Sequence, residues 1–213
     1  MIATLFVETD GCYYNLPDVD PWDVQRDARN YAGPNPVVAH PPCQRWGRFW
    51  HGSTRKPHQF KLGDDGGCFE SALLNVHRWG GVIEHPAYSK AWDSFDLPKP
   101  TRGKGWRVGY REVARGHWRW IASCYVEQGH YGHFARKPTW LFTSSRKRLE
   151  LPELNWEKGE QRIHPRALEL HGYEKARRIG MVAMVGGKDK TRIRNSTPPA
   201  FRDVLISIAR GAA

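Results

Sequence analysis

The sequence predicts an α/β fold, in which helices flank a Rossmann-like and mostly parallel sheet. A strand pattern at residues 2–8, a helix start at Asp20 and a second strand at residues 36–40 form a strand–helix–strand unit. A helical apolar pattern at residues 67–79 then leads into a third strand at residues 81–85. Parallel strands need crossover connections of this kind, so these strands are expected to run in parallel. The length of 213 residues suits one domain that spans residues 1–213.

The second half of the chain predicts three further strands and a closing helix. Strand patterns cover residues 106–110, 118–125 and 137–143, and an amphipathic helix opens at Thr197-Pro198-Pro199. Residues 144–192 are basic and have no apolar period, so they are expected to form a small, loop-rich insertion. The cations of this region are either candidate phosphate contacts or simply solvated charges.

The charge of the chain favours a polyanionic partner. The net charge is +11 and the isoelectric point is near 9.7, which points most simply to nucleic acid, although a solvated basic surface would give the same values. Aromatic and basic residues alternate in Arg45-Trp46-Gly47-Arg48-Phe49-Trp50 and in His117-Trp118-Arg119-Trp120. This mixture suits phosphate contacts combined with base stacking, so DNA is the expected partner.

The cysteines indicate a reducing compartment. The four cysteines are widely spaced and form no C-x-x-C pair, and neither a secretory pattern nor an apolar run of about 20 residues is present. A cytoplasmic protein without a membrane partner is therefore expected. Cys43, Cys68, His51 and His58 match no zinc-ligand spacing, so no metal is expected either.

The segment from Val37 to Gly47 is the most informative stretch of the sequence. Its short apolar run ends at two prolines, which cannot continue a central strand, and Cys43 follows directly. Cys43 is therefore expected in a stiff loop at the carboxyl edge of the sheet, where α/β sheets bind their ligands. A free cysteine is often only a small buried hydrophobe, but Arg45 and Arg48 would favour a reactive thiolate.

The third strand ends in the same way as the second, with Glu84-His85-Pro86 after an apolar run. This repetition places Glu84 and Cys43 at the same edge of the sheet, on neighbouring strands joined by the helix. Because Glu84 follows the buried residues Val82 and Ile83, its pKa is expected to be raised so that it holds a proton.

These features together resemble DNA cytosine-C5 methyltransferases. That family carries a Pro-Cys-Gln loop, similar to Pro42-Cys43-Gln44, and a Glu-Asn-Val element one helix and one strand later, at the position of Glu84. Gln128, with Arg136-Lys137 following, is similar to the family's Gln-x-Arg-x-Arg pair, and the segment from Arg194 to Phe201 resembles its Gly-Asn-Ala-Val-Pro-Pro element. The four matches occur in the family's order over residues 36–210. The chain also resembles short, phage-type proteins labelled as DNA methylases, for which the compartment would be the host cytoplasm.

The chain departs from the family at the loop that binds the cofactor. The family's Phe-x-Gly-x-Gly loop is represented only by Phe6 and Gly11, and Glu-Asn-Val has become Glu84-His85-Pro86. The first arginine after Gln128 is replaced by His130, and the target-recognition domain is nearly absent. The base chemistry of the family therefore carries over better than its cofactor site.

The resemblance implies covalent chemistry on a pyrimidine base of DNA, with cytosine-C5 methyl transfer as the principal expectation. Cys43 would add to C6 and make C5 nucleophilic, protonated Glu84 would bind N3, and Gln128 or Arg136 would hold the base edge or a phosphate. The target base would leave the stack, with Trp46 or Trp50 taking its place. The expected DNA contacts are Gln44, Arg45, Trp46, Arg48, Trp50 and Lys137. The expected cofactor is S-adenosylmethionine, at Phe6, Glu8, Asp10, Gly11, Asp20 and Asn195, with an acidic side chain on its ribose.

Two alternatives remain open on the sequence. The same addition at C6 would serve a different one-carbon donor, as in hydroxymethylation or further modification of an already modified base. The chain would otherwise be a non-catalytic, DNA-binding relative of the methyltransferase fold in which Cys43 is merely packed.

Overall fold

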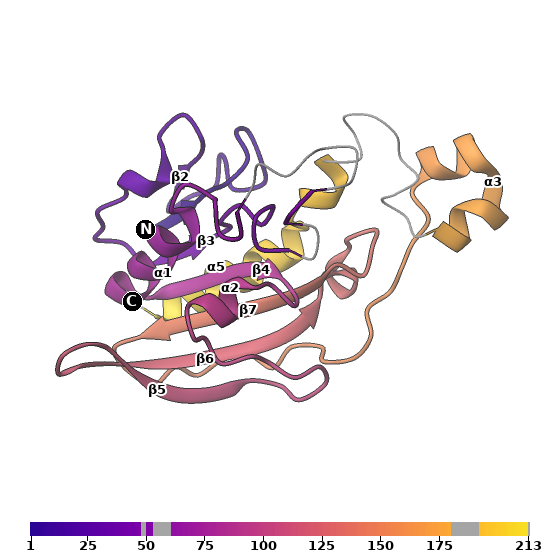
Figure 1. Ribbon diagram of the computed structural model, residues 1–213. Coiled ribbons are helices and arrows are strands. Elements are labelled where there is room, and N and C mark those ends of the chain that lie inside the picture. Colours follow the sequence, from indigo (N-terminus) through magenta and orange to yellow (C-terminus); the bar gives the residue numbers. More distant parts are fainter. Residues whose placement is uncertain (48–49, 53–60, 180–191, 213) are drawn as a thin grey trace.

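The computed structural model describes residues 1–47, 50–52, 61–179 and 192–212 (Figure 1). Seven strands form one sheet in the order β2-β1-β3-β4-β7-β6-β5. The strands are β1 (Ile2–Leu5), β2 (Val19–Trp22), β3 (Val37–Ala39), β4 (Gly81–Pro86), β5 (Arg107–Ala114), β6 (His117–Glu127) and β7 (Pro138–Ser145).

The sheet is parallel in one half and alternates in direction in the other. β2, β1, β3 and β4 pair in parallel, whereas β7 is antiparallel to β4, β6 to β7 and β5 to β6. β6 consequently points the same way as the first four strands, and only β7 and β5 point the opposite way. The predicted α/β class with a mostly parallel sheet is confirmed.

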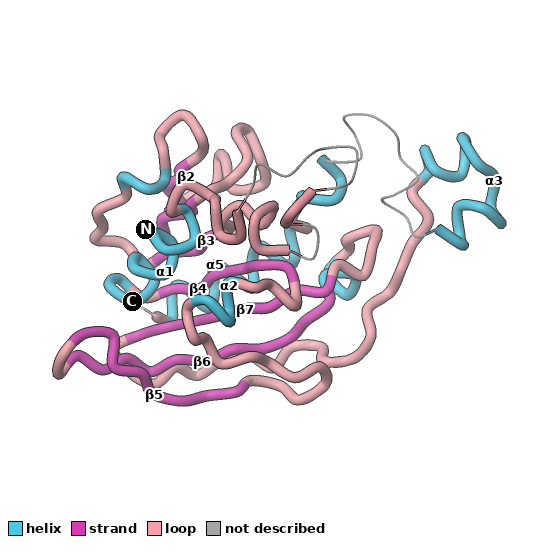
Figure 2. Tube along the Cα trace, viewed as in Figure 1, coloured by secondary structure: helices cyan, strands magenta, loops and turns pink. Residues whose placement is uncertain are grey.

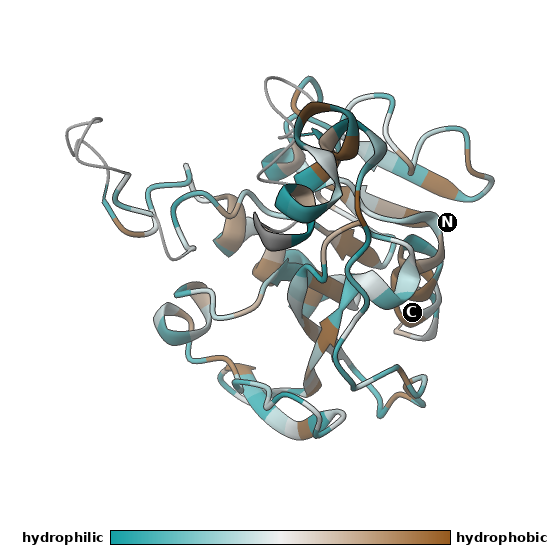
Figure 3. Cartoon of the chain, turned by 90° about the vertical axis from the view of Figure 1, so that its right-hand side faces the viewer, coloured by the Kyte–Doolittle hydropathy of each residue, from teal (hydrophilic) through white to brown (hydrophobic). Residues whose placement is uncertain are grey.

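Helices cover both faces of the central strands. α1 (Cys68–Trp79) and α2 (Ala91–Ser94) pack on one face, and α5 (Pro199–Gly211) packs on the other, against β1, β3 and β4. Figure 2 shows the strands between these helices, and Figure 3 shows brown, hydrophobic residues in the strands and helices of the interior. β3 is a continuous apolar run and β4 begins with one, as is usual for parallel strands that are buried on two faces.

A glycine fixes the pairing of β3 with β4. Gly81 has a φ of 134°, and a Cβ atom there would lie 2.0 Å from the carbonyl oxygen of Val37. Only glycine permits this approach. The resulting register pairs Ala39 with Ile83, so the residues that follow each of them lie side by side at the carboxyl edge of the sheet.

The predicted helix at Asp20 is wrong, because the segment forms strand β2. Backbone pairing of Val19 with Ile2 outweighs the local helix-start signal, and Pro21 is tolerated because β2 is an edge strand. The only helical turn in this part of the described chain is a short 3₁₀ helix, η1 (Ala28–Asn30). The residues that join β1 to β2 are all described and form turns rather than a helix.

The other predicted elements are confirmed, but the basic insertion is not entirely irregular. Residues 165–179 form α3 (Pro165–Ile179), which is kinked at Gly172 and projects away from the sheet (Figure 1). A second 3₁₀ helix, η2 (Gln128–Tyr131), follows β6 directly. No helix within the described ranges is long and apolar enough to cross a membrane.

Candidate active site

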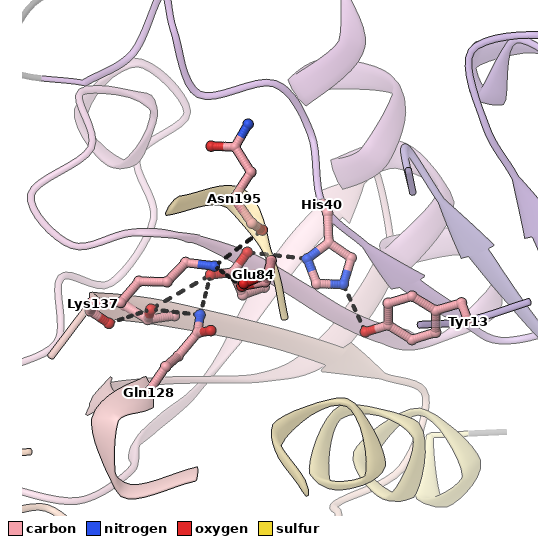
Figure 4. A network of polar contacts seen from close by, with 8 residues as sticks. Tyr13, His40, Glu84, Gln128, Lys137 and Asn195 are labelled. Atoms are coloured by element: carbon pink, nitrogen blue, oxygen red, sulfur yellow. Dashed lines mark hydrogen bonds and ion pairs between the residues drawn. The ribbon is translucent and has the colours of Figure 1, made fainter. Parts of the chain in front are cut away.

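The carboxyl ends of β3 and β4 bring a histidine and a glutamate into direct contact. His40 follows β3 and its N–H donates to the Leu5 carbonyl at 3.0 Å, which continues the sheet pairing by one residue. Its Nδ1 lies 3.0 Å from Oε2 of Glu84 (Figure 4). The sheet register alone therefore creates this pair.

Glu84 accepts hydrogen bonds at both of its carboxylate oxygens. Nε2 of Gln128 donates to Oε1 at 2.7 Å, and the Thr139 hydroxyl lies 3.4 Å from the same oxygen. The Glu84 residue is only 7% exposed, and Gln128 is fully buried. Gln128, which follows β6, and Thr139 in β7 thus reach the end of β4 from the antiparallel half of the sheet.

Lys137, which is half-buried, supplies a positive charge to the same site. Its Nζ donates to the backbone carbonyls of Asn195 at 3.3 Å and Ser196 at 2.9 Å, which ties the segment before α5 to β7 (Figure 4). Burial lowers the pKa of Lys137, while the charge of Glu84 acts to raise it. Lys137 was expected to contact DNA, but its ammonium instead points into the protein.

The predicted protonation of Glu84 is wrong. Burial alone would raise the pKa of this carboxyl, but the Lys137 ammonium and the bond and charge of His40 outweigh it and lower the pKa to about 2. Glu84 is therefore ionised at neutral pH. The sequence indicated its burial but gave no sign of the cations around it.

Cys43 lies near this carboxylate and is a thiol rather than a thiolate. Burial raises the pKa of the half-buried Cys43, the charge of Glu84 raises it further, and Arg194 and Lys137 only partly offset these effects. The expected low pKa of Cys43 is therefore wrong, and the guanidinium of Arg45, expected to activate the thiol, donates to the Trp50 carbonyl at 3.2 Å. Arg48 lies outside the described residues.

Besides His40, two further residues that the sequence analysis did not single out complete the network. The hydroxyl of Tyr13 lies 2.7 Å from Nε2 of His40, and Tyr13 is only 3% exposed. Both ring nitrogens of His40 therefore have partners, Glu84 at Nδ1 and the Tyr13 hydroxyl at Nε2. Thr139 is the second such residue, and no sequence pattern distinguishes its hydroxyl from those of Thr143 and Ser145 further along the strand.

Trp46 belongs to the core rather than to a DNA-binding surface. It is 5% exposed, its Nε1 donates to Asp65 at 2.7 Å, and its ring packs against Phe69 and Phe95. The prediction that Trp46 stacks on a base is therefore wrong. Exposed Gln44 and half-buried Trp50 remain available beside Cys43.

Arg136 also borders this region. It is half-buried, and its guanidinium Nε is buried without a hydrogen-bond partner among the described residues.

The residues expected to bind S-adenosylmethionine do not form a cradle for it. The loop after β1, which begins at Phe6 and carries exposed Glu8 and Asp10, leads to β2 without a helix whose N-terminus could face a ligand. Gly11 serves a tight turn, since its Cβ would lie 2.8 Å from the Glu8 carbonyl oxygen. The Asp20 carboxylate, expected on a ribose, is already bound to Arg26 at 2.6 Å. These residues do not fit the cofactor.

Two further expectations concern Asn195 and a metal. Asn195 lies beside the Glu84 network through its backbone carbonyl, far along the chain from the loop after β1. No group of three potential metal ligands occurs among the described residues, and His58 lies outside them.

Comparison with known proteins adds no assignment. No family model matches the chain, and no curated protein matches it.

Proposed function

We propose that the protein modifies pyrimidine bases of DNA at C5, with cytosine as the base and methyl transfer as the reaction. One observation carries this proposal: a loop cysteine and a buried carboxylate from the neighbouring strand converge at the carboxyl edge of an α/β sheet. Glu84 is close enough to Cys43 for its charge to raise the thiol pKa, so the two groups act as a coupled pair.

The Cys43–Glu84 pair carries the proton that the reaction requires. At neutral pH the thiol of Cys43 is protonated and Glu84 is ionised, so the pair holds one proton. When Sγ bonds to C6, the ring electrons shift through C5 and C4 to N3, and the proton displaced from sulfur ends on N3. Glu84 is suited to pass that proton, after exchanging its bond to His40 or Gln128 for one to the base.

The addition makes C5 nucleophilic without any donor. In the adduct, C5 takes a proton from water, loses its original hydrogen, and Cys43 then leaves as C6 recovers its double bond. The hydrogen at C5 therefore exchanges with solvent. Because the residues after β1 do not fit S-adenosylmethionine, this exchange tests the proposal independently of the donor of the methyl group.

DNA is supported as the substrate by the groups around Cys43. The charge of Arg194 reaches the thiol, and Nε of Arg136, which precedes Lys137 in the chain and has no hydrogen-bond partner among the described residues, suits a phosphate or a base carbonyl. A target base must leave the stack to reach a half-buried sulfur, and among the described aromatic residues of this loop Trp50 is half-buried whereas Trp46 belongs to the core.

The direct test is release of tritium from DNA labelled at C5 of cytosine. The wild-type protein is expected to release tritium into water without a cofactor, and Cys43→Ser is expected to abolish the release. Cys68→Ser is the matched control. Cys68 is also a half-buried free cysteine, but it is the first residue of helix α1. Absence of release by the wild-type protein between pH 6 and pH 9 would contradict the proposal.

A second candidate is DNA binding without catalysis. It is favoured by the raised pKa of Cys43 and by the full occupancy of both Glu84 oxygens, which describe a satisfied structural cluster. The same assay separates the two functions: DNA binding that is unchanged in Cys43→Ser, without tritium release by the wild-type protein, supports this alternative. Mass spectrometry of nucleosides after incubation with S-adenosylmethionine then tests methyl transfer itself.

A further inference from the structure

A group of exposed hydrophobic side chains lies at the end of the sheet opposite to Cys43. Tyr110 pairs with Trp120 across the β5–β6 hairpin, and Glu112 pairs with Trp118, so these side chains share one face. Val108, Tyr110 and Trp118 are 58%, 66% and 57% exposed. On the same face Trp120 is buried, because Leu149 and the end of α5 cover it. The covered part of this face thus ends at Trp120.

Four cations accompany these rings. Arg115 lies in the turn of the hairpin, and Arg146, Lys147 and Arg148 are exposed residues that follow β7. Because Leu149 packs with Trp120, the chain between β7 and Leu149 crosses to the face that carries Tyr110 and Trp118. None of the four cations forms an ion pair with a described carboxylate, whereas Arg26 and Arg29 are bound to Asp20 and Asp27.

We propose that this amino-end surface, made of Tyr110, Trp118, Arg115, Arg146, Lys147 and Arg148, binds single-stranded nucleic acid. Exposed aromatic rings stack on bases, and unpaired cations bind phosphates. Tyr110 and Trp118 are diagonal neighbours on antiparallel strands, so they lie about 7–8 Å apart. A duplex keeps the faces of its bases inside the stack, so exposed rings favour an unpaired strand as the occupant.

The amino-end surface is separate from the Cys43 site. Trp118 and Glu127 lie at opposite ends of β6, which corresponds to about 30 Å at the usual rise of a strand. Figure 1 shows the β5–β6 turn at the end of the sheet away from α3. Binding there needs no chemistry at Cys43 and therefore extends the proposed function without depending on it.

The test is fluorescence anisotropy of a labelled 20-nucleotide oligodeoxythymidine with the full-length protein. The double variant Tyr110→Ala/Trp118→Ala is expected to bind about 10-fold more weakly or worse, since two stacking platforms are lost. The triple variant Arg146→Ala/Lys147→Ala/Arg148→Ala is expected to reduce the slope of log affinity against log salt by about 2, because three phosphate contacts disappear.

Matched controls separate this surface from general effects of charge and exposure. Leu74→Ala removes another exposed apolar side chain, which is 62% exposed, and Arg26→Ala/Arg29→Ala removes two cations that carboxylates already neutralise. Both are expected to bind the oligonucleotide like the wild-type protein. Unchanged thermal melting of each variant shows that its fold is retained.

Three results would overturn the inference. They are equal oligonucleotide affinity of the surface variants and the wild-type protein, a loss confined to duplex DNA, and tighter binding to phosphatidylserine vesicles that the oligonucleotide does not displace. Retained oligonucleotide binding by Cys43→Ser supports the separation of the two sites. A failure of tritium release would contradict the proposed function alone, since this affinity is measured without catalysis.

Discussion

Replacing Glu84 by glutamine is predicted to destabilise the protein by about 3 kcal/mol at pH 7. The environment lowers the pKa of Glu84 from the ordinary value of 4.5 to about 2. A difference of about 2.5 pKa units corresponds to about 3 kcal/mol of preference for the ionised, folded form. The glutamine has no charge to balance the half-buried ammonium of Lys137, which acts to lower the pKa of Glu84.

The predicted loss depends on pH in a defined direction. Because the pKa of Glu84 is lower in the folded than in the unfolded chain, its contribution is fully present above about pH 5.5. It decreases as the pH falls through 4.5 and is lost near pH 2, where the carboxyl is protonated in both states. The difference in stability between the wild-type protein and Glu84→Gln should therefore close across this interval.

Urea unfolding followed by tryptophan fluorescence measures this difference at several pH values between 7 and 3. Glu153→Gln is the control, because Glu153 is an exposed carboxyl whose loss should change stability little at any pH. A stability difference that stays constant between pH 7 and pH 3 would refute the electrostatic reasoning. So would a glutamine variant as stable as the wild-type protein at pH 7.

Three further predictions address the packing that supports the site. Trp46→Ala should lower the free energy of unfolding in urea by about 3–5 kcal/mol, because a buried indole and its bond to Asp65 are lost. A loss under about 1 kcal/mol would contradict the burial of Trp46. Gly81→Ala should abolish cooperative thermal unfolding, since its Cβ would meet the Val37 carbonyl, and a normal melting curve would argue against the β3–β4 register. Tyr13→Phe should cost about 1–3 kcal/mol in urea unfolding through the unsatisfied Nε2 of His40, and no change would contradict a stabilising role for this hydrogen bond.

The sheet was predictable where local and tertiary signals agree. β3 and β4 are short apolar runs that end in proline, so the sequence placed both strands and the polar residues at their carboxyl ends. The proximity of Cys43 to Glu84 followed from this pattern. Helix α1 between the strands was equally clear, since a regular apolar face ends there at paired glycines.

Prediction failed where contacts distant in sequence decide the outcome. Asp20-Pro21 has the chemistry of a helix start, yet pairing with β1 makes it a strand. Trp46 lies in a loop without hydrophobic periodicity, so its local sequence does not distinguish a buried ring from an exposed ring that stacks on a base. Tyr13 joined the site because the loop after β1 folds back beside His40, and no spacing rule indicates this contact.

The site shows most clearly why the protonation states of its residues are harder to predict from sequence than their positions in the fold. Burial acts on Cys43 and Glu84 in the same direction and would raise both pKa values. Lys137 and His40 reverse the effect at Glu84, while the resulting negative charge of Glu84 adds to it at Cys43. The pKa values are thereby driven apart, so that one proton rests on sulfur and the nearby carboxylate is ionised. Environments that separate the pKa values of two titratable groups in this way are typical of acid–base pairs, and the proposed addition of Cys43 to a base would start from this protonation state.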